Sequence, residues 1–190
     1  MDKERARLGM IGRWKDKYYR DGELVEETEW THNQIQNVAP IIAAGLFHRW
    51  DELPAGQVPV PFEGISYIAV GSGDVAWDAL APGTVPQDRA DTTLTTEYYR
   101  QSILASDMSF LDADDPAHPV VAGPSRMIQI ESTFLPADAN GAMREFGLFC
   151  GFATGLPDSG HILNWIVHPL INKDATLTIT RTIQIEFLEP

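Results

Sequence analysis

The sequence has little that could serve as a covalent cross-link, a membrane anchor or a secretion signal. Its single cysteine, Cys150, excludes an internal disulfide, and beside Phe149 and Phe152 we expect a small buried hydrophobic group rather than a nucleophile. No apolar run approaches the roughly 18–20 residues of a membrane-spanning helix. The charged start, Met1–Arg7, is not followed by the apolar segment of a signal peptide. We therefore expect a soluble protein made in a cytoplasm.

Positive charge is also scarce. The chain has 14 Lys and Arg residues against 27 Asp and Glu, which gives a formal net charge of -13. Binding to nucleic acid or to an anionic membrane depends on clustered Lys and Arg that neutralise phosphates. We therefore expect neither as a partner. The length of 190 residues, without an internal repeat, fits a single domain over residues 31–190 preceded by an extension over residues 1–30.

The familiar signatures of metal and cofactor sites are missing. None of the five histidines has a second ligand at a spacing typical of zinc motifs. His161 and His168 would point to opposite faces of one strand, roughly 23 Å apart at about 3.3 Å per residue. The acidic run of Asp112, Asp114 and Asp115 lacks the glycine turn and the distal glutamate of a calcium loop, which favours a solvated loop. We expect no cofactor and no metal.

Catalytic signatures are missing as well. Gly71-Ser72-Gly73 lacks the third glycine and the following Lys-Ser or Lys-Thr of a phosphate-binding loop. There is no Gly-x-Ser-x-Gly elbow, and Ser159 before Gly160 is typical of a turn. Because no nucleophile, base and orienting group can be named together, we expect a non-enzymatic protein.

What the sequence does contain is strand-type alternation. It is clearest from Leu177 to Phe187, where apolar side chains alternate with threonine, glutamine and glutamate. Met127–Leu135 has the same half-buried pattern, and His161–His168 is apolar on both faces, as in a central strand. Ile65–Val70 and Leu94–Leu104 are further predicted strands. The segments 51–64, 74–92 and 106–124 are predicted to be irregular loops because of their proline, glycine and acidic residues.

One short α-helix is predicted, with Asn37 as its N-cap and Pro40 in its first turn. The sum predicts a mainly β fold: an antiparallel β-sandwich or barrel-like domain with one short α-helix and long irregular loops.

The stretch Ala142–Phe149 is predicted to be a central strand, because both of its faces carry apolar and charged residues. The turn residues 138–141 predict a hairpin between this strand and the run ending at Phe134. Gly147 is expected to let a neighbouring aromatic ring pack across the strand. Arg181 faces the apolar side of its own strand, so it needs an acidic partner such as Glu145 or Glu97. The predicted structural core includes Glu145, Gly147, Arg181 and Arg100, with Glu145 the preferred partner of Arg181 or Arg100.

The segment from Gly12 to Trp30 is predicted to be a hairpin around Asp21-Gly22, a pair suited to a type I′ turn. Many of its residues are charged, so we expect an exposed hairpin that docks on another subunit. The predicted subunit contacts are the aromatic residues Trp14, Tyr18, Trp30 and Trp50.

The order of several segments carries a resemblance to a known family. The segments are Trp30–Asn37, Ile65–Gly73 (ISYIAVGSG), Asp91–Arg100 (DTTLTTEYYR), Met143–Phe149 (MREFGLF), His168–Lys173 and a threonine-rich strand over Ala175–Phe187. This succession resembles tailed-bacteriophage structural proteins of the tail-fibre and tail-collar type, in which an "iAvGsG" turn, a "dT.L..E..R" segment and a "reiGLf" strand recur in the same order. The resemblance covers residues 30–188. Two loops, 74–91 and 107–124, are longer than in that family, and no fibrous shaft or receptor-binding domain follows Pro190, so we expect an attachment domain standing alone.

The resemblance implies a virion structural protein in the tail, baseplate or neck of a phage or phage-like particle, as an attachment or adaptor subunit. Its expected partners are copies of itself and other virion proteins, with a host-surface glycan left open. A capsid decoration (cement) protein is an alternative of similar size, acidity and β content. A carbohydrate-binding β-sandwich module is a second alternative, because exposed aromatic residues such as Trp50 and Trp77 can stack on sugars.

Overall fold

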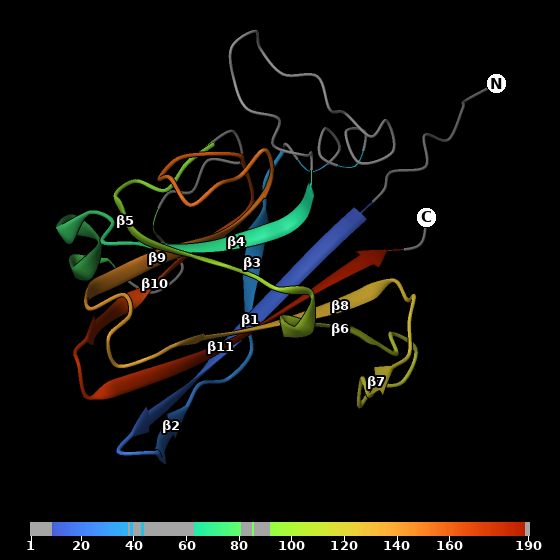
Figure 1. Cartoon of the computed structure of the whole chain (residues 1–190), viewed down its shortest axis with the longest axis horizontal. Helices are drawn as coiled ribbons and strands as arrows, with labels where there is room; N and C mark the ends of the chain where they lie inside the picture. The colour runs from blue at the N-terminus through green and yellow to red at the C-terminus, as the bar shows by residue number, and fades with distance from the viewer. Residues whose placement is uncertain are drawn as a thin grey trace, which may run out of the picture.

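The computed structural model describes residues 9–37, 39, 43, 63–80, 85 and 92–188, and this part of the chain is mainly β (Figure 1). Eleven strands form one antiparallel sheet, and they account for 59% of the described residues. The strands are β1 (Gly9–Arg20), β2 (Glu23–Glu27), β3 (Thr31–Ile35), β4 (Glu63–Gly71), β5 (Glu97–Ser102), β6 (Met108–Leu111), β7 (Val120–Val121), β8 (Met127–Phe134), β9 (Gly141–Gly151), β10 (His161–Lys173) and β11 (Leu177–Leu188). Two short 3₁₀ helices are η1 (Val75–Ala79) and η2 (Ala105–Asp107).

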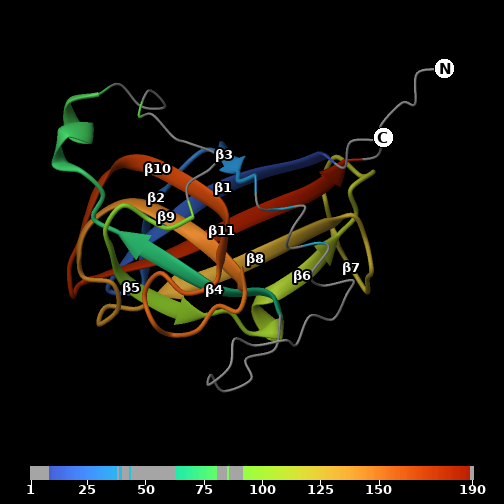
Figure 2. The same cartoon turned by 90° about the horizontal axis from the view of Figure 1, so that it is seen from above.

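The sheet has two halves that meet at β3. Its strand order is β5-β4-β9-β10-β3-β1-β11-β8-β6-β7, with β2 beside β1. The first part of β3 pairs with β1 and its last two residues pair with β10, so this short strand joins the halves. Figures 1 and 2 show the half with β4, β5 and β9 lying against the half with β1, β8 and β11.

Side chains from the two halves meet in one apolar core. The ring centroids of Trp14 on β1 and Phe146 on β9 are 5.3 Å apart, and those of Tyr99 on β5 and Phe134 on β8 are 6.2 Å apart. Burial of such large aromatic side chains stabilises the packing of the halves, at roughly 1.5–3 kcal/mol for each side chain that is fully buried.

Most of the predicted strands are confirmed. Ile65–Val70, Met127–Leu135, His161–His168 and Leu177–Phe187 correspond to β4, β8, β10 and β11, and β5 lies within Leu94–Leu104. The region 106–124, predicted to be irregular, contains β6 and β7, which extend the sheet beyond β8. The predicted helix lies outside the described residues, apart from Ala39 and Ala43, which are helical.

The predicted hairpin between β8 and β9 is wrong. β8 pairs with β11 and β6, while β9 pairs with β4 and β10. The turn between them forms, because Asp138 donates its backbone N–H to Leu135 and its carboxylate accepts from the Leu135 N–H. It carries the chain from one half of the sheet to the other. The apolar sides of β8 and β9 then contribute to the same buried cluster, and burial of this apolar surface stabilises the arrangement.

The turn of the first hairpin is confirmed. Asp21 and Gly22 both have positive φ, 50° and 82°, as a type I′ turn requires, and Arg20 pairs with Glu23. All 12 residues of β1 also pair with β11, so β1 is part of the main sheet. Within this hairpin only β2 is exposed along its whole length. Of the hairpin predicted to dock on another subunit, β2 is the part that is exposed for such a contact. The docking itself stays a prediction.

Candidate functional site

The carboxylate of Glu145 lies at the centre of the best-connected polar site. It is completely buried on β9, and its Oε1 accepts from the Thr96 backbone N–H at 2.9 Å. Its Oε2 accepts from the Thr95 N–H at 3.1 Å and from the Trp165 indole N–H at 2.8 Å. Three directed donors replace the water that the carboxylate loses on burial. Glu145 therefore fastens β10 and the chain before β5 to β9.

The neighbouring residue Arg144 fastens a second connection from the opposite side of β9. Its guanidinium donates to both carboxylate oxygens of Asp78, each at 2.7 Å, and to the Ser72 carbonyl at 3.0 Å. This contact holds the pKa of the Asp78 carboxyl below its usual value. Ser72 in turn donates its N–H to the Thr96 carbonyl at 2.9 Å. Three of the segments that carry the resemblance, around Ser72, Thr96 and Arg144, thus meet at one junction.

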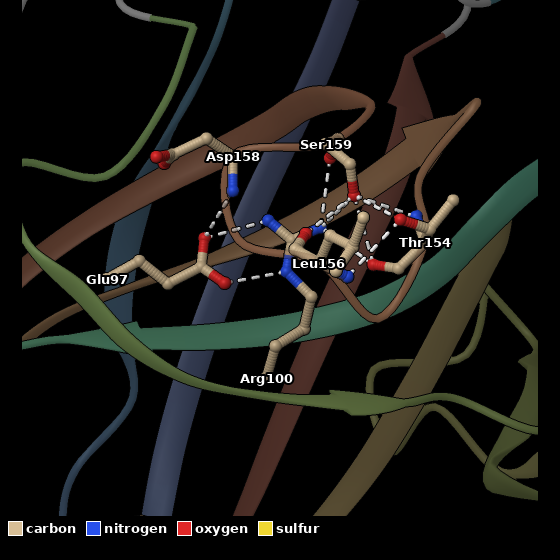
Figure 3. Close-up of polar contacts among 6 residues, drawn as sticks. All are labelled: Glu97, Arg100, Thr154, Leu156, Asp158 and Ser159. Atoms are coloured by element: carbon tan, nitrogen blue, oxygen red, sulfur yellow. Dashed lines mark hydrogen bonds and ion pairs between the residues drawn. The ribbon is translucent and has the colours of Figure 1, made fainter.

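Arg100 forms a second buried junction, with the loop between β9 and β10 (Figure 3). Its guanidinium makes a two-pronged ion pair with Glu97, at 2.7 and 2.8 Å, and both side chains are almost fully buried. The remaining nitrogen donates to the carbonyls of Thr154 and Ser159 at 3.2 and 2.9 Å. Phe149 lies beneath it, 4.1 Å from ring centroid to guanidinium carbon.

Ser159 closes this loop on itself, as turn chemistry predicts. Its hydroxyl donates to the Leu156 carbonyl at 2.7 Å and accepts from the Thr154 N–H at 2.8 Å. Asp158 has a φ of 58° and donates its N–H to Glu97 at 3.2 Å. These contacts make a structural clasp on the loop, and in the described part of the chain no base lies against the Ser159 hydroxyl.

The predicted ionic partners of Arg181 and Arg100 are wrong. Arg181 pairs with Asp16 of β1, at 2.7 and 2.6 Å, and both side chains are completely buried. Glu145 contacts neither arginine, because its three hydrogen bonds go to backbone and indole donors. The predicted core residues are nevertheless buried, as expected: Glu145, Gly147, Arg181 and the side chain of Arg100.

The role expected of Gly147 also needs correction. A Cβ at this position would lie 2.6 Å from Ile162 Cδ1 and 2.9 Å from the Asn164 carbonyl. An aliphatic side chain and the backbone of β10, rather than an aromatic ring, therefore require the glycine.

The aromatic residues predicted to contact other subunits differ in their exposure. Trp14 is only 6% exposed, so its predicted docking role is wrong: alternation along β1 turns it toward the core. Tyr18 is half-buried, and its hydroxyl donates to Asp16. Trp30 is half-buried, with Arg13 and Lys15 lying 4.7 and 5.2 Å from its ring centroid. Trp50 lies outside the described residues.

Sequence reasoning missed Asp16. Asp16 lies between Lys15 and Lys17 in the sequence, and these charges predicted a solvent-exposed strand. In the structure Trp14, Asp16 and Tyr18 share one face of β1. The period of two along β1 is the signal that could have placed Asp16 inside.

A recess of about 590 Å³ opens between β3, β10 and the chain that joins β2 to β3. Trp14 and His168 line it from the core side, and Asn33 lines it from β3. The Trp14 indole N–H, His168 Nε2 and the Asn33 side-chain amide are buried and have no hydrogen-bond partner among the described residues. Buried polar groups are normally paired, so these three groups are exceptions, and their complete burial places them behind the wall of the recess.

The burial of Cys150 and the turn in the acidic loop agree with the sequence analysis. Cys150 is completely buried, and burial raises the pKa of its thiol to about 12, so it stays protonated. In the acidic loop Asp112 accepts from the N–H groups of Asp114 and Asp115 as an ordinary turn cap. Across the described ranges no group of three or more His, Cys, Asp and Glu side chains could hold a metal ion. None of the helices in this part of the chain is long and apolar enough to span a membrane.

No protein-family model matches the chain, and comparison with curated proteins and with solved structures gives no significant match.

Proposed function

We propose that this protein is a non-enzymatic structural subunit of a tailed phage or phage-like particle, an attachment or adaptor subunit of its tail, baseplate or neck. The proposal rests on the order of segments that resembles tail-fibre and tail-collar proteins, and on one structural observation. That observation is the exposed free edge of β2.

All five residues of β2 are exposed, and within the described part of the chain this strand pairs only with β1. Its outer backbone groups are therefore available to a strand of a neighbouring subunit. Leu24 and Val25 are 51% and 55% exposed and supply apolar contact beside that edge. Glu23 and Glu26 are exposed on the same strand, so the charge of β2 favours a partner strand with basic residues.

β2 is held firmly by the strands beneath it, as a contact between subunits requires. It is carried by β1, which pairs with β11 along its whole length and is tied to it by the buried Asp16–Arg181 ion pair. A type I′ turn and an ion pair between Lys15 and Glu27 set the position of β2 against β1. A docking strand held this firmly loses little conformational entropy on assembly.

The proposal is tested with purified particles and with the isolated protein. Mass spectrometry of gradient-purified particles should detect the wild-type chain, and the double substitution Leu24→Glu with Val25→Glu should greatly reduce its incorporation. Leu156→Glu is the matched control, because Leu156 is 71% exposed on a different surface. A wild-type protein that stays monomeric and never copurifies with particles would overturn the proposal.

A further inference from the structure

We propose that Lys173 and Asn140 react with each other to form an intramolecular isopeptide bond, a covalent cross-link that needs no cysteine. The inference is independent of the proposed virion role, because it rests on the chemistry of one turn and of the strand end beside it.

The two side chains meet where β9 begins and β10 ends. Lys173 is the last residue of β10 and pairs with Gly141, the first residue of β9, so Asn140 lies one residue before that pair. The Lys173 ammonium donates to Asn140 Oδ1 at 3.2 Å. Asn140 Cγ is bonded to that oxygen, so the amine and the carbon that it attacks are neighbours in the folded chain. Such proximity replaces the encounter of two separate reactants.

The orientation of the Asn140 amide follows from its partners. Oδ1 faces the Lys173 ammonium, which only donates, and Nδ2 donates at 2.9 Å to the Pro136 carbonyl, which only accepts. The nitrogen that must leave therefore lies on the side of Pro136, away from the attacking amine. Asn140 is exposed, so the released ammonia can pass into solvent.

Lys173 has the surroundings of a reactive amine. Its residue is 3% exposed, and its ammonium also donates to the Leu135 carbonyl at 2.7 Å. Burial lowers the pKa of this ammonium, against the opposing effect of the Asp138 and Asp174 charges. The neutral amine therefore forms more readily here than on an exposed lysine, and desolvated lysines serve as nucleophiles in proteins for the same reason.

Asp138 is placed to carry the proton. Its carboxylate accepts from the Leu135 N–H at 2.9 Å, in the same turn, and its charge acts on the Lys173 ammonium. Asp138 takes one proton from that ammonium. The Lys173 nitrogen then bonds to Asn140 Cγ, and the bond from Cγ to Nδ2 breaks as Asp138 returns the proton to the departing nitrogen.

The reaction balances without an oxidant or a cofactor. The second proton lost from the Lys173 nitrogen goes to the released ammonia, which becomes ammonium. One ammonium side chain and one primary amide thus become a secondary amide and an ammonium ion. The product joins the start of β9 to the end of β10, and a covalent link between distant residues restricts the unfolded chain.

Mass spectrometry tests the proposal on the full chain. Folded protein, incubated at physiological temperature and pH, should lose about 17 Da, the mass of one ammonia molecule. A tryptic digest should contain a branched peptide with both Asn140 and Lys173, because trypsin does not cleave after a lysine whose amine is acylated. Protein incubated in urea should keep its full mass, since the reaction depends on the folded arrangement.

Variants assign the roles of the three side chains. Lys173→Arg keeps the charge and the donors but has no nucleophilic amine, so it should keep its full mass. Asp138→Asn can still accept from the Leu135 N–H, and it should form the bond on the order of a hundredfold more slowly. Asn172→Ala, at an exposed asparagine of the same strand, should cross-link like the wild type.

Three results would overturn the proposal. The first is a folded wild-type protein that keeps its full mass. The second is a gain of about 1 Da from deamidation of Asn140 in place of the loss. The third is a loss of ammonia without the branched peptide, as a succinimide at Asn140-Gly141 with a free Lys173 amine would give. The branched peptide is detected in the wild-type chain, so this readout holds even if a variant fails to fold.

Discussion

The Trp165 indole N–H donates a 2.8 Å hydrogen bond to Glu145 Oε2 and so joins two adjacent central strands through their side chains. The same carboxylate holds the backbone N–H groups of Thr95 and Thr96, just before β5. One buried carboxyl group, with no cationic partner among the described residues, thus connects β9, β10 and the chain entering β5. Its three donors make it a structural centre of this half of the sheet.

Removing that carboxylate should destabilise the protein strongly. Glu145→Ala leaves three buried donors unsatisfied and opens a cavity, so we expect the free energy of unfolding to fall by about 3–5 kcal/mol. Glu145→Gln keeps the shape but replaces one acceptor with a donor, and we expect a loss of about 1–3 kcal/mol. Urea denaturation measures both. A Glu145→Ala protein as stable as the wild type would mean that the carboxylate is solvated.

Gly147 should not tolerate a methyl group. Gly147→Ala places a Cβ 2.6 Å from Ile162 Cδ1 and 2.9 Å from the Asn164 carbonyl, so we expect a loss of about 1–3 kcal/mol from overpacking. Gly64→Ala is the matched control, because it also lies in a strand and its Cβ would meet nothing within 4 Å. Equal thermal stability of the two variants would contradict the close approach of β10.

The Arg100 clasp should control the opening of the loop between β9 and β10. Arg100→Met keeps much of the aliphatic stem but removes the ion pair with Glu97 and the bonds to the loop carbonyls. Hydrogen exchange at the amides of Thr154 and Asp158 should become at least about tenfold faster. Arg20→Met, at an exposed arginine of β1, should leave these two amides protected. Unchanged exchange in Arg100→Met would show that the loop holds itself closed.

Stability should depend on pH through His168. Its folded-state pKa of about 4 lies below the ordinary value of 6.5, because burial and Arg181 disfavour the charged ring. The unfolded chain therefore binds more protons between these values, so stability is full above about pH 6.5 and falls as pH drops toward 4, by on the order of 3 kcal/mol. Burial lowers the pKa of His161 too, which adds loss of the same sign.

His168→Gln isolates this contribution. The variant lacks the titrating ring, so its unfolding free energy should decline less than that of the wild type between pH 6.5 and about 4. Parallel curves for the two proteins would mean that His168 titrates alike in the folded and unfolded chains.

The strands were predictable because period-two alternation is local. Thus β11 and β8 follow directly from their apolar and polar positions, and the Asp21-Gly22 turn follows from its need for positive φ. Pairing was less predictable. The turn after Phe134 has hairpin chemistry, but whether two strands pair by their edges or pack by their faces depends on the whole core.

The partner of a buried charged residue was as difficult to predict from the sequence as the pairing of the strands. The inward orientation of Arg181 follows from its strand, whereas the choice of Asp16 over Glu145 depends on β1 lying beside β11, a pairing of residues far apart in the sequence. The recess was not predictable either, because it arises where β1 and β10 separate around β3.

Site-specific photo-crosslinking inside intact particles tests most directly our proposal that this chain is a virion subunit that docks through β2. A benzophenone amino acid at Val25, 55% exposed, should crosslink the chain to another virion protein or to a second copy. The same group at Leu156, 71% exposed, should give far less of that product. Particles that lack the chain, or equal crosslinking from the two positions, would contradict the account.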